Sequence, residues 1–224
     1  VRLGGMRWGG ALSERVRVPF ADHMMLPLPA NIDPTDFASP DNVPDGYRTV
    51  AVPLRDRPGA EVLVVGGGAL SVALYSVACA VALGASRVVY LDTDDERLAI
   101  ARKLGAEAHH GPSGQPGDRY PITVDASANP AGLSFALLST APGGVCTSVG
   151  IYYTPTTPIP LLSMYGAGIT FITGRVNARA CLPEVLELVT RGALVPKQVT
   201  SLVAPWDEAP DALLDPGPKV VITR

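Results

Sequence analysis

The chain has 224 residues, which is enough to bury one sizeable core and a small second lobe, but not two full domains. Its 18 basic and 21 acidic residues give a formal net charge of -3, and no run of Lys or Arg is long enough to follow a phosphate backbone, so a nucleic-acid partner is not expected. The three cysteines lack metal-ligand spacing and lie in apolar surroundings, which predicts reduced core residues of a cytoplasmic protein (Cys79, Cys146 and Cys181).

The first 60 residues differ in character from the rest. Residues 12–20, "LSERVRVPF", alternate as a half-buried strand would. Residues 26–46 are punctuated by proline and predict a connection with short helical turns at most. We interpret both as part of a second lobe. Because the chain begins with Val1 and lacks an apolar leader, we also expect it to be a piece of a longer cytoplasmic parent.

Residues 62–86 contain no charged side chain and are long enough to suggest a membrane helix. However, residues 62–65 are a short run typical of a strand, and the glycines at 66–68 would break a helix. Only residues 69–83 remain helical, which is too short to cross a bilayer. The stretch therefore predicts a strand, a glycine turn and a helix that ends at Gly84, and no membrane span.

A second apolar strand follows at residues 87–92, "RVVYLD", and ends in an acid, which completes the first half of a dinucleotide-binding unit. Gly66 permits the tight turn, and Gly68 lets the backbone approach a pyrophosphate held by amides at Ala69 and Leu70. Asp92 would accept ribose hydroxyls and repel a 2′-phosphate, which favours NAD over NADP. The alternative is a Rossmann-like fold that binds no nucleotide.

Ser71 stands where this pattern has its third glycine, whose role is close packing of helix against strand. We expect either a slightly wider gap between helix and strand or a hydroxyl turned back to a carbonyl.

The later elements alternate between strand and helix, which predicts an α/β fold with a doubly wound parallel sheet over residues 46–195. Strands are expected at 120–127, 143–152 and 168–174, with a third strand ending near His109 and His110; helices are expected at 94–105, 129–141 and 182–192, the last with Pro183 in its first turn. Residues 111–117 predict a surface loop, and the tail predicts strand, short helix, strand.

The ordered motifs "VLVVGGG", "VVYLDTDDERLAIARKLGAE", "VDASANP", "APGGVCTSVGIY" and "FITGR" resemble the medium-chain dehydrogenase/reductase superfamily, the zinc-type alcohol dehydrogenases. The resemblance implies a Rossmann domain at 46–195, with remnants of a β-rich GroES-like catalytic lobe at 1–45 and in the return segment 196–224. It further implies NAD as cofactor, zinc in the parent family, an alcohol or aldehyde substrate, and a possible homo-oligomer. Met24, Met25, Leu26 and Leu28 would lose cover where the lobe is missing.

Site residues follow from the same resemblance. Asp41, in "SPDNVPDGYRT", matches the last catalytic zinc ligand in its carboxylate form, although it could equally be an N-cap or turn residue. Further cofactor contacts are implied at Arg97 and Ser127 toward the adenosine, at Val149, Gly150 and Gly174 near the nicotinamide, and at Arg175 toward the pyrophosphate. No catalytic residue is assigned, and one carboxylate cannot hold zinc, since a catalytic site needs about three protein ligands.

Three functions remain open. The parent is expected to be an NAD-dependent alcohol or aldehyde dehydrogenase, of which this chain alone would be inactive. A non-catalytic nucleotide-binding or dimerisation module is the second, and a methyltransferase using the same glycine turn is the third. A short-chain dehydrogenase is excluded, because no Tyr is followed four residues later by Lys.

Overall fold

The computed structural model describes residues 10, 12–113 and 116–224. Its helices are α1 (Ala21–Met24), α2 (Asn42–Asp56), α3 (Leu70–Ala82), α4 (Asp95–Lys103), α5 (Pro130–Leu138), α6 (Leu161–Ala167), α7 (Ala178–Thr190) and α8 (Ala209–Ala212), with short 3-10 turns at Pro196–Val199 and Trp206–Glu208. Its strands are β1 (Val62–Val65), β2 (Val88–Asp92), β3 (Glu107–His110), β4 (Tyr120–Asp125), β5 (Thr140–Ser148), β6 (Thr170–Thr173), β7 (Leu202–Pro205) and β8 (Val220–Thr223).

Six of the strands form one sheet in the order β3-β2-β1-β4-β5-β6, and every neighbouring pair is parallel. The predicted doubly wound sheet is therefore confirmed. The strands are added outward from β1 to β3 and then, on its other side, from β4 to β6, so the order of addition reverses between the central strands β1 and β4. All four residues of β1 are buried, as expected of a central strand that is covered on both faces.

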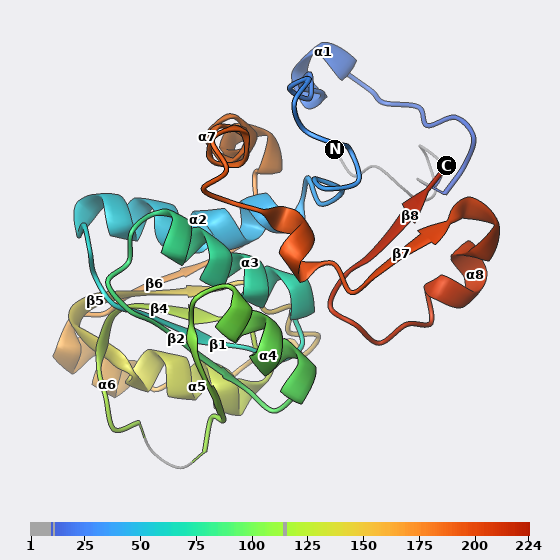
Figure 1. The fold of residues 1–224 in the computed structure, drawn as a ribbon. Coiled ribbons are helices and arrows are strands. Elements are labelled where there is room, and N and C mark those ends of the chain that lie inside the picture. The colour runs from blue at the N-terminus through green and yellow to red at the C-terminus, as the bar shows by residue number, and fades with distance from the viewer. Residues whose placement is uncertain (1–9, 11, 114–115) are drawn as a thin grey trace.

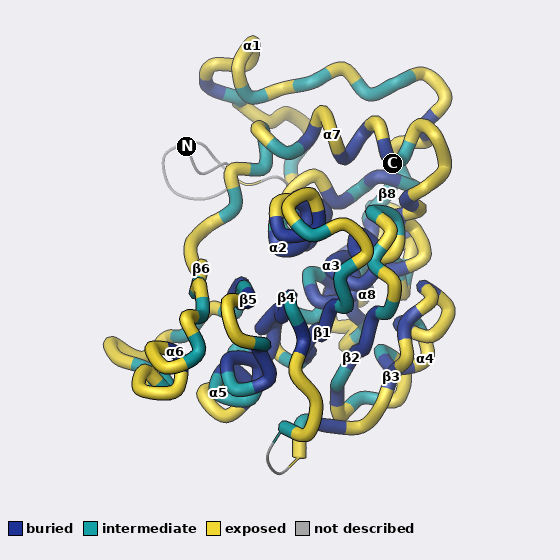
Figure 2. Tube along the Cα trace, turned by 90° about the vertical axis from the view of Figure 1, so that its left-hand side faces the viewer, coloured by how far each residue is buried: buried dark blue, intermediate teal, exposed yellow. Residues whose placement is uncertain are grey.

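Alternate side chains of β1 point to opposite faces of the sheet and pack into two separate hydrophobic clusters. Val62 and Val64 belong to a cluster that includes side chains of α2, α3 and α7, whereas Leu63 and Val65 pack with α5 and Met164 of α6. The sheet thus lies between two helical layers (Figure 1). Figure 2 shows that β6 and α6 lie at an exposed edge of this arrangement.

Two helices begin with a side-chain cap, and a third ends at the predicted glycine stop. Asp94 accepts a hydrogen bond from the Arg97 amide at 2.9 Å at the start of α4, and Asn129 accepts one from the Ala131 amide at 2.8 Å at the start of α5. Gly84 follows Leu83, the C-cap of α3, and has a φ of 82°, as a C-terminal glycine stop requires.

The structure corrects the reading of the first 60 residues. Residues 12–20 contain no strand, and a helix of 15 residues, α2, begins at Asn42 inside the predicted connection. Proline is tolerated in a first turn, where Pro44 lies, because amides there have no helical partner. Buried residues at helical spacing then hold α2 against α3, namely Val43, Tyr47, Val50 and Leu54.

Smaller corrections concern element boundaries. Strand β5 begins at Thr140, inside the helix predicted at 129–141, and α6 lies in a segment for which no element was predicted. Helix α7 begins at Ala178, so Pro183 lies inside it and not in its first turn.

The apolar segment before α2 is more covered than expected. Met25 is exposed, but Leu26 and Leu28 are partly buried against the main core, and Met24 is intermediate. The tail forms strand, short helix and strand as predicted, with β7 parallel to β8. Among the described residues, no helix combines the length and the apolar character that a membrane crossing needs.

Candidate functional site

The candidate site lies at the carboxyl edge of the sheet. Helix α3 leads from β1 to β2, and α5 leads from β4 to β5, so the connections diverge where β1 and β4 pair. In open parallel sheets, ligands bind outside the strand ends at such a point. The glycine turn between β1 and α3 lies there.

The glycine turn is held against the loop that follows β4. The Gly68 amide donates to the Ser127 carbonyl at 2.8 Å, and the Ala69 amide donates to the Ala126 carbonyl at 3.0 Å. A Cβ atom on Gly68 would lie 2.8 Å from the Cβ of Ala128, so glycine is required at this contact. The Ala69 amide is therefore hydrogen-bonded within the protein. Leu70 is the first residue of α3, and no side chain caps this helix start.

Ser71 does not turn its hydroxyl back to a carbonyl. Its Oγ accepts a hydrogen bond from Nδ2 of Asn42, the first residue of α2, at 2.7 Å. The close approach of α3 is made to α2 at Gly46. A Cβ atom on Gly46 would lie 2.7 Å from the backbone of Tyr75 and Ser76 in α3. The serine thus joins α3 to α2.

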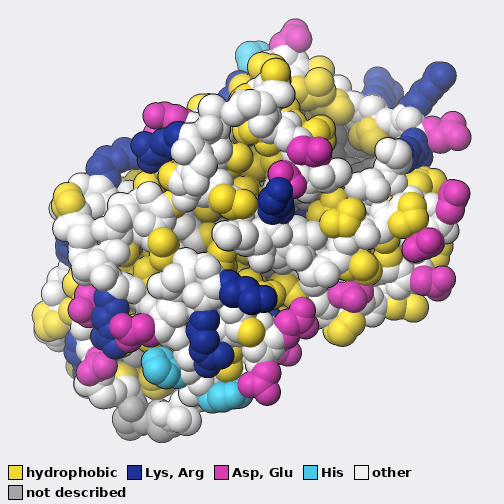
Figure 3. All heavy atoms as spheres, viewed as in Figure 1, with side chains coloured by type: hydrophobic (Ala, Val, Ile, Leu, Met, Phe, Trp, Pro, Cys, Tyr) yellow, Lys and Arg dark blue, Asp and Glu magenta, His cyan; other side chains and the backbone are white. Residues whose placement is uncertain are grey.

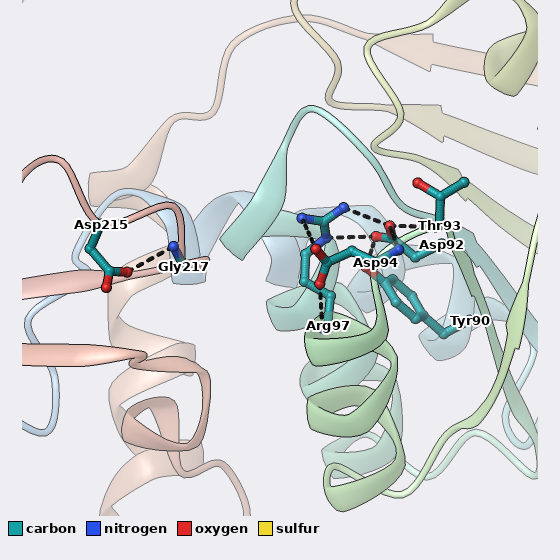
Figure 4. Close-up of polar contacts among 7 residues, drawn as sticks. All are labelled: Tyr90, Asp92, Thr93, Asp94, Arg97, Asp215 and Gly217. Atoms are coloured by element: carbon teal, nitrogen blue, oxygen red, sulfur yellow. Dashed lines mark hydrogen bonds and ion pairs between the residues drawn. The ribbon is translucent and has the colours of Figure 1, made fainter.

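Asp92 is buried and fully engaged at the end of β2 (Figure 4). Its carboxylate accepts Nη2 and Nε of Arg97 at 2.7 and 2.9 Å, together with the phenol of Tyr90. Burial acts to raise the pKa of Asp92, but the donors from Arg97 and Tyr90 outweigh it and hold this pKa below its ordinary value. Burial and the Asp92 charge raise the pKa of Tyr90, which keeps the phenol a donor.

A second buried carboxylate, Asp125, lies at the end of β4. It accepts hydrogen bonds from the hydroxyls of Ser127 at 2.5 Å, Ser148 at 2.6 Å and Tyr152 at 2.8 Å. Burial, followed by the Asp125 charge, raises the pKa of Tyr152 and keeps it protonated. These bonds tie the β4 loop to the end of β5.

The remaining predicted contacts divide into two places. Ser127, Val149 and Gly150 lie with the glycine turn, because Ser127 bonds to Gly68 and a Cβ on Gly150 would lie 3.0 Å from the backbone of Ala128. Gly174 and Arg175 lie beside α2 instead. The Gly174 carbonyl accepts Nη2 of Arg48 at 2.7 Å, and the charge of exposed Arg175 acts on Asp45.

Asp41 occupies the N-cap position of α2, but its side chain makes no capping hydrogen bond. It is exposed, and its charge acts on the Lys219 ammonium, whose pKa is lowered by burial and partly restored by Asp41. Among the described residues, no group of three or more His, Cys, Asp or Glu could hold a metal ion. These residues therefore do not fit a catalytic zinc. His23, His109 and His110 are exposed, and His110 pairs with Asp95 at 3.0 Å.

Sequence reasoning missed Tyr90, Asp125, Ser148 and Tyr152. Tyr90 could have been found, because residues two apart on a strand share a face and Asp92 was already assigned. Asp125 repeats the pattern of an acid that ends an apolar strand. Tyr152 lies beyond the strand, and its approach to Asp125 depends on how the chain turns after β5.

The strand order and the glycine turn define the Rossmann-type class of α/β protein. The family model of the zinc-binding dehydrogenases matches residues 71–191. The chain belongs to this family, within the medium-chain dehydrogenase/reductase superfamily.

Individual relatives agree with this assignment. An alcohol dehydrogenase of Cupriavidus necator is 29% identical over 231 residues, which covers 91% of this chain and 61% of that protein. An uncharacterised zinc-type alcohol dehydrogenase-like protein, YdjL, of Escherichia coli K12 is 31% identical over 47% of this chain and 31% of its own length. The solved alcohol dehydrogenase TADH of Thermus sp. ATN1 superposes with a TM-score of 0.87 at 30% identity, covering 96% of this chain and 68% of that one. The chain thus spans about a third to three fifths of these two curated relatives.

Proposed function

We propose that the chain supplies the cofactor-binding part of an NAD-dependent oxidoreductase that transfers hydride between a nicotinamide and an alcohol or aldehyde. The main support for this proposal is the position of Asp92, because its Oδ2 and the Tyr90 phenol lie so close to Gly66 that a Cβ atom on that residue would clash with both. The ribose acceptor and the phosphate-binding turn are thereby adjacent, at the edge where α3 begins. Bound NAD would supply the hydride acceptor.

The proposed contacts follow the course of a dinucleotide across this edge. Asp92 serves the adenosine ribose, with Arg97 beside it on the adenosine side. The turn from Gly66 to Leu70, in which the Gly66, Gly68 and Ala69 amides bond to the protein, lies against the pyrophosphate at the start of α3. Further contacts are proposed at Ser127, Val149, Gly150, Gly174 and Arg175.

Fluorescence titration with NADH and NADPH tests this proposal. NADH should bind more tightly, because a 2′-phosphate would approach the Asp92 carboxylate. Replacing Asp92 with Ser should narrow the difference by about 1–3 kcal/mol, through relief of unfavourable charge and desolvation. Equal affinities in the unaltered chain would remove Asp92 from the ribose role.

We also propose that the 224-residue chain on its own binds no stoichiometric zinc and oxidises no alcohol. A catalytic zinc needs about three protein ligands, and no group of three or more His, Cys, Asp or Glu within the described part of the chain could hold a metal ion. Metal analysis of the purified chain, together with an ethanol and NAD assay, tests this. One tightly bound zinc per chain with measurable turnover would contradict it.

A non-catalytic nucleotide-binding or dimerisation module is the second candidate, favoured because the described residues bring no set of zinc ligands together. The two candidates differ in what an added catalytic lobe would do. A related N-terminal lobe that carries zinc ligands, fused ahead of the chain, should restore turnover if the chain is an enzyme part. A stable fused protein that binds zinc and NADH without turnover would favour the module.

A further inference from the structure

The described residues fill the acceptor positions of the Asp92 carboxylate. Oδ1 accepts the amides of Thr93 at 2.7 Å and Asp94 at 3.1 Å, and Nη2 of Arg97 at 2.7 Å. Oδ2 accepts the Tyr90 phenol and Nε of Arg97, the latter at 2.9 Å. Since a carboxylate offers about four lone-pair positions, these donors leave none for a ribose hydroxyl. A ribose can bind Asp92 only if a donor leaves.

Arg97 is the donor that can leave. The amides of Thr93 and Asp94 belong to the turn that starts α4, which the bond from the Arg97 amide to Asp94 fixes. Tyr90 is fully buried and packs against Gly66. The Arg97 side chain, in contrast, is 14% exposed while that of Asp92 is 0% exposed, so the guanidinium forms the solvent side of the pair.

A second carboxylate is within reach of the same guanidinium. Nη1 of Arg97 lies 3.6 Å from Oδ2 of Asp94, whose side chain is 43% exposed. The Oδ1 atom of Asp94 is the one that caps α4, so its other oxygen is available to Arg97. Figure 4 shows the Arg97 guanidinium between the two carboxylates. Arg97 can therefore leave Asp92 and keep an ion pair.

We propose that Arg97 is a displaceable occupant of the ribose acceptor, replaced on Asp92 by a ribose hydroxyl and then held by Asp94. This inference rests on the proposed dinucleotide site and specifies how it opens. Tyr90 stays on Oδ2 and keeps the carboxylate oriented. Because Arg97 neutralises Asp92 until it moves, the negative charge that disfavours a 2′-phosphate is exposed only as the nucleotide binds.

Stopped-flow fluorescence with NADH tests the displacement in four chains: unaltered, Arg97→Gln, Asp94→Asn and Lys103→Gln. Arg97→Gln removes the occupant and should speed association and tighten binding by about tenfold. Asp94→Asn keeps the helix cap, because Asn caps as well as Asp, but it removes the charge that receives Arg97, so association should slow. Lys103→Gln removes one positive charge from the exposed surface of α4. It measures how much the loss of a positive charge alone changes NADH binding.

The outcomes separate this inference from the proposed function. Weaker NADH binding by Arg97→Gln than by Lys103→Gln, with Asp94→Asn unchanged, would show that Arg97 stays on Asp92 in the complex and would overturn the displacement alone. Absence of NADH binding in all four chains, each shown to be folded by circular dichroism, would overturn both.

Discussion

At the scale of single residues, two buried carboxylates stabilise the edge that carries the candidate site. Asp92 is held by Arg97 and Tyr90, and Asp125 is held by three hydroxyls. A buried carboxylate is stable only when its oxygens are hydrogen-bonded. Removing either the carboxylate or one of its donors should therefore lower the free energy of unfolding.

Replacing Asp92 with Asn should lower the free energy of unfolding by about 2–3 kcal/mol at pH 7, because Arg97 loses its charge partner. The pKa of Asp92 in the folded chain lies below 3.8. Its contribution is therefore complete above that value and is lost as the pH falls through the folded pKa. Urea unfolding at pH 7 and near pH 3 should show the difference from the unaltered chain shrinking in acid.

The matched control is Asp95→Asn, which removes an exposed carboxylate from the first turn of α4, the helix that follows β2, and should change stability by less than about 0.5 kcal/mol. A difference between the unaltered chain and Asp92→Asn that stays constant into acid would contradict the assigned direction of the pKa.

Replacing Tyr152 with Phe should lower the free energy of unfolding by about 1–2 kcal/mol, because Asp125 loses the donor at 2.8 Å. Tyr153→Phe is the control, since Tyr153 is 91% exposed. Thermal unfolding of both variants makes the comparison. Equal effects would mean that the Tyr152 hydroxyl contributes nothing specific.

At the scale of elements, the crossing of α2 over α3 depends on a glycine. A Cβ on Gly46 would lie 2.7 Å from the Tyr75 and Ser76 backbone, so the two helices must separate to admit one. Gly46→Ala should therefore destabilise the chain by about 1–3 kcal/mol. Loss of Val43 and Val50 contacts would accompany any shift of α2.

Gly166→Ala in α6 gives a direct contrast, because a Cβ there meets nothing within 4 Å. The same substitution should stabilise the chain by up to about 1 kcal/mol through helix propensity. Denaturant unfolding of the two variants should shift in opposite directions. A shift in the same direction would show that the α2–α3 contact is looser than the structure indicates.

The elements also show what the sequence could predict. The sheet was predictable because β1, β2 and β4 are apolar runs, of which the first is followed by glycine and the other two end in an acid. Each is also followed by a helix that begins at a capping residue or ends at a glycine. Helix α2 was not, because its prolines and Gly46 resemble loop residues locally. Its stability comes from packing against α3, which no local pattern reports.

At the scale of the whole molecule, the chain combines a complete doubly wound sheet with the separate β7–β8 pair (Figure 1). Basic and acidic side chains lie among one another over the face drawn in Figure 3, in agreement with the small net charge. The position of the site was predictable at this scale, because strand order alone places Gly66, Asp92 and Ser127 at one edge. The hydrogen bonds from Tyr90 and Arg97 to Asp92 were not predictable, because they depend on how far and in which direction these side chains extend.

Amide chemical-shift mapping of the ¹⁵N-labelled chain tests whether it binds NADH at the carboxyl edge of its sheet. On addition of NADH, we expect the largest shifts at residues 66–71, 92–97 and 149–150. Shifts confined to the cavity of about 520 Å³ lined by β7 and α8, or no shifts at millimolar NADH, would contradict it.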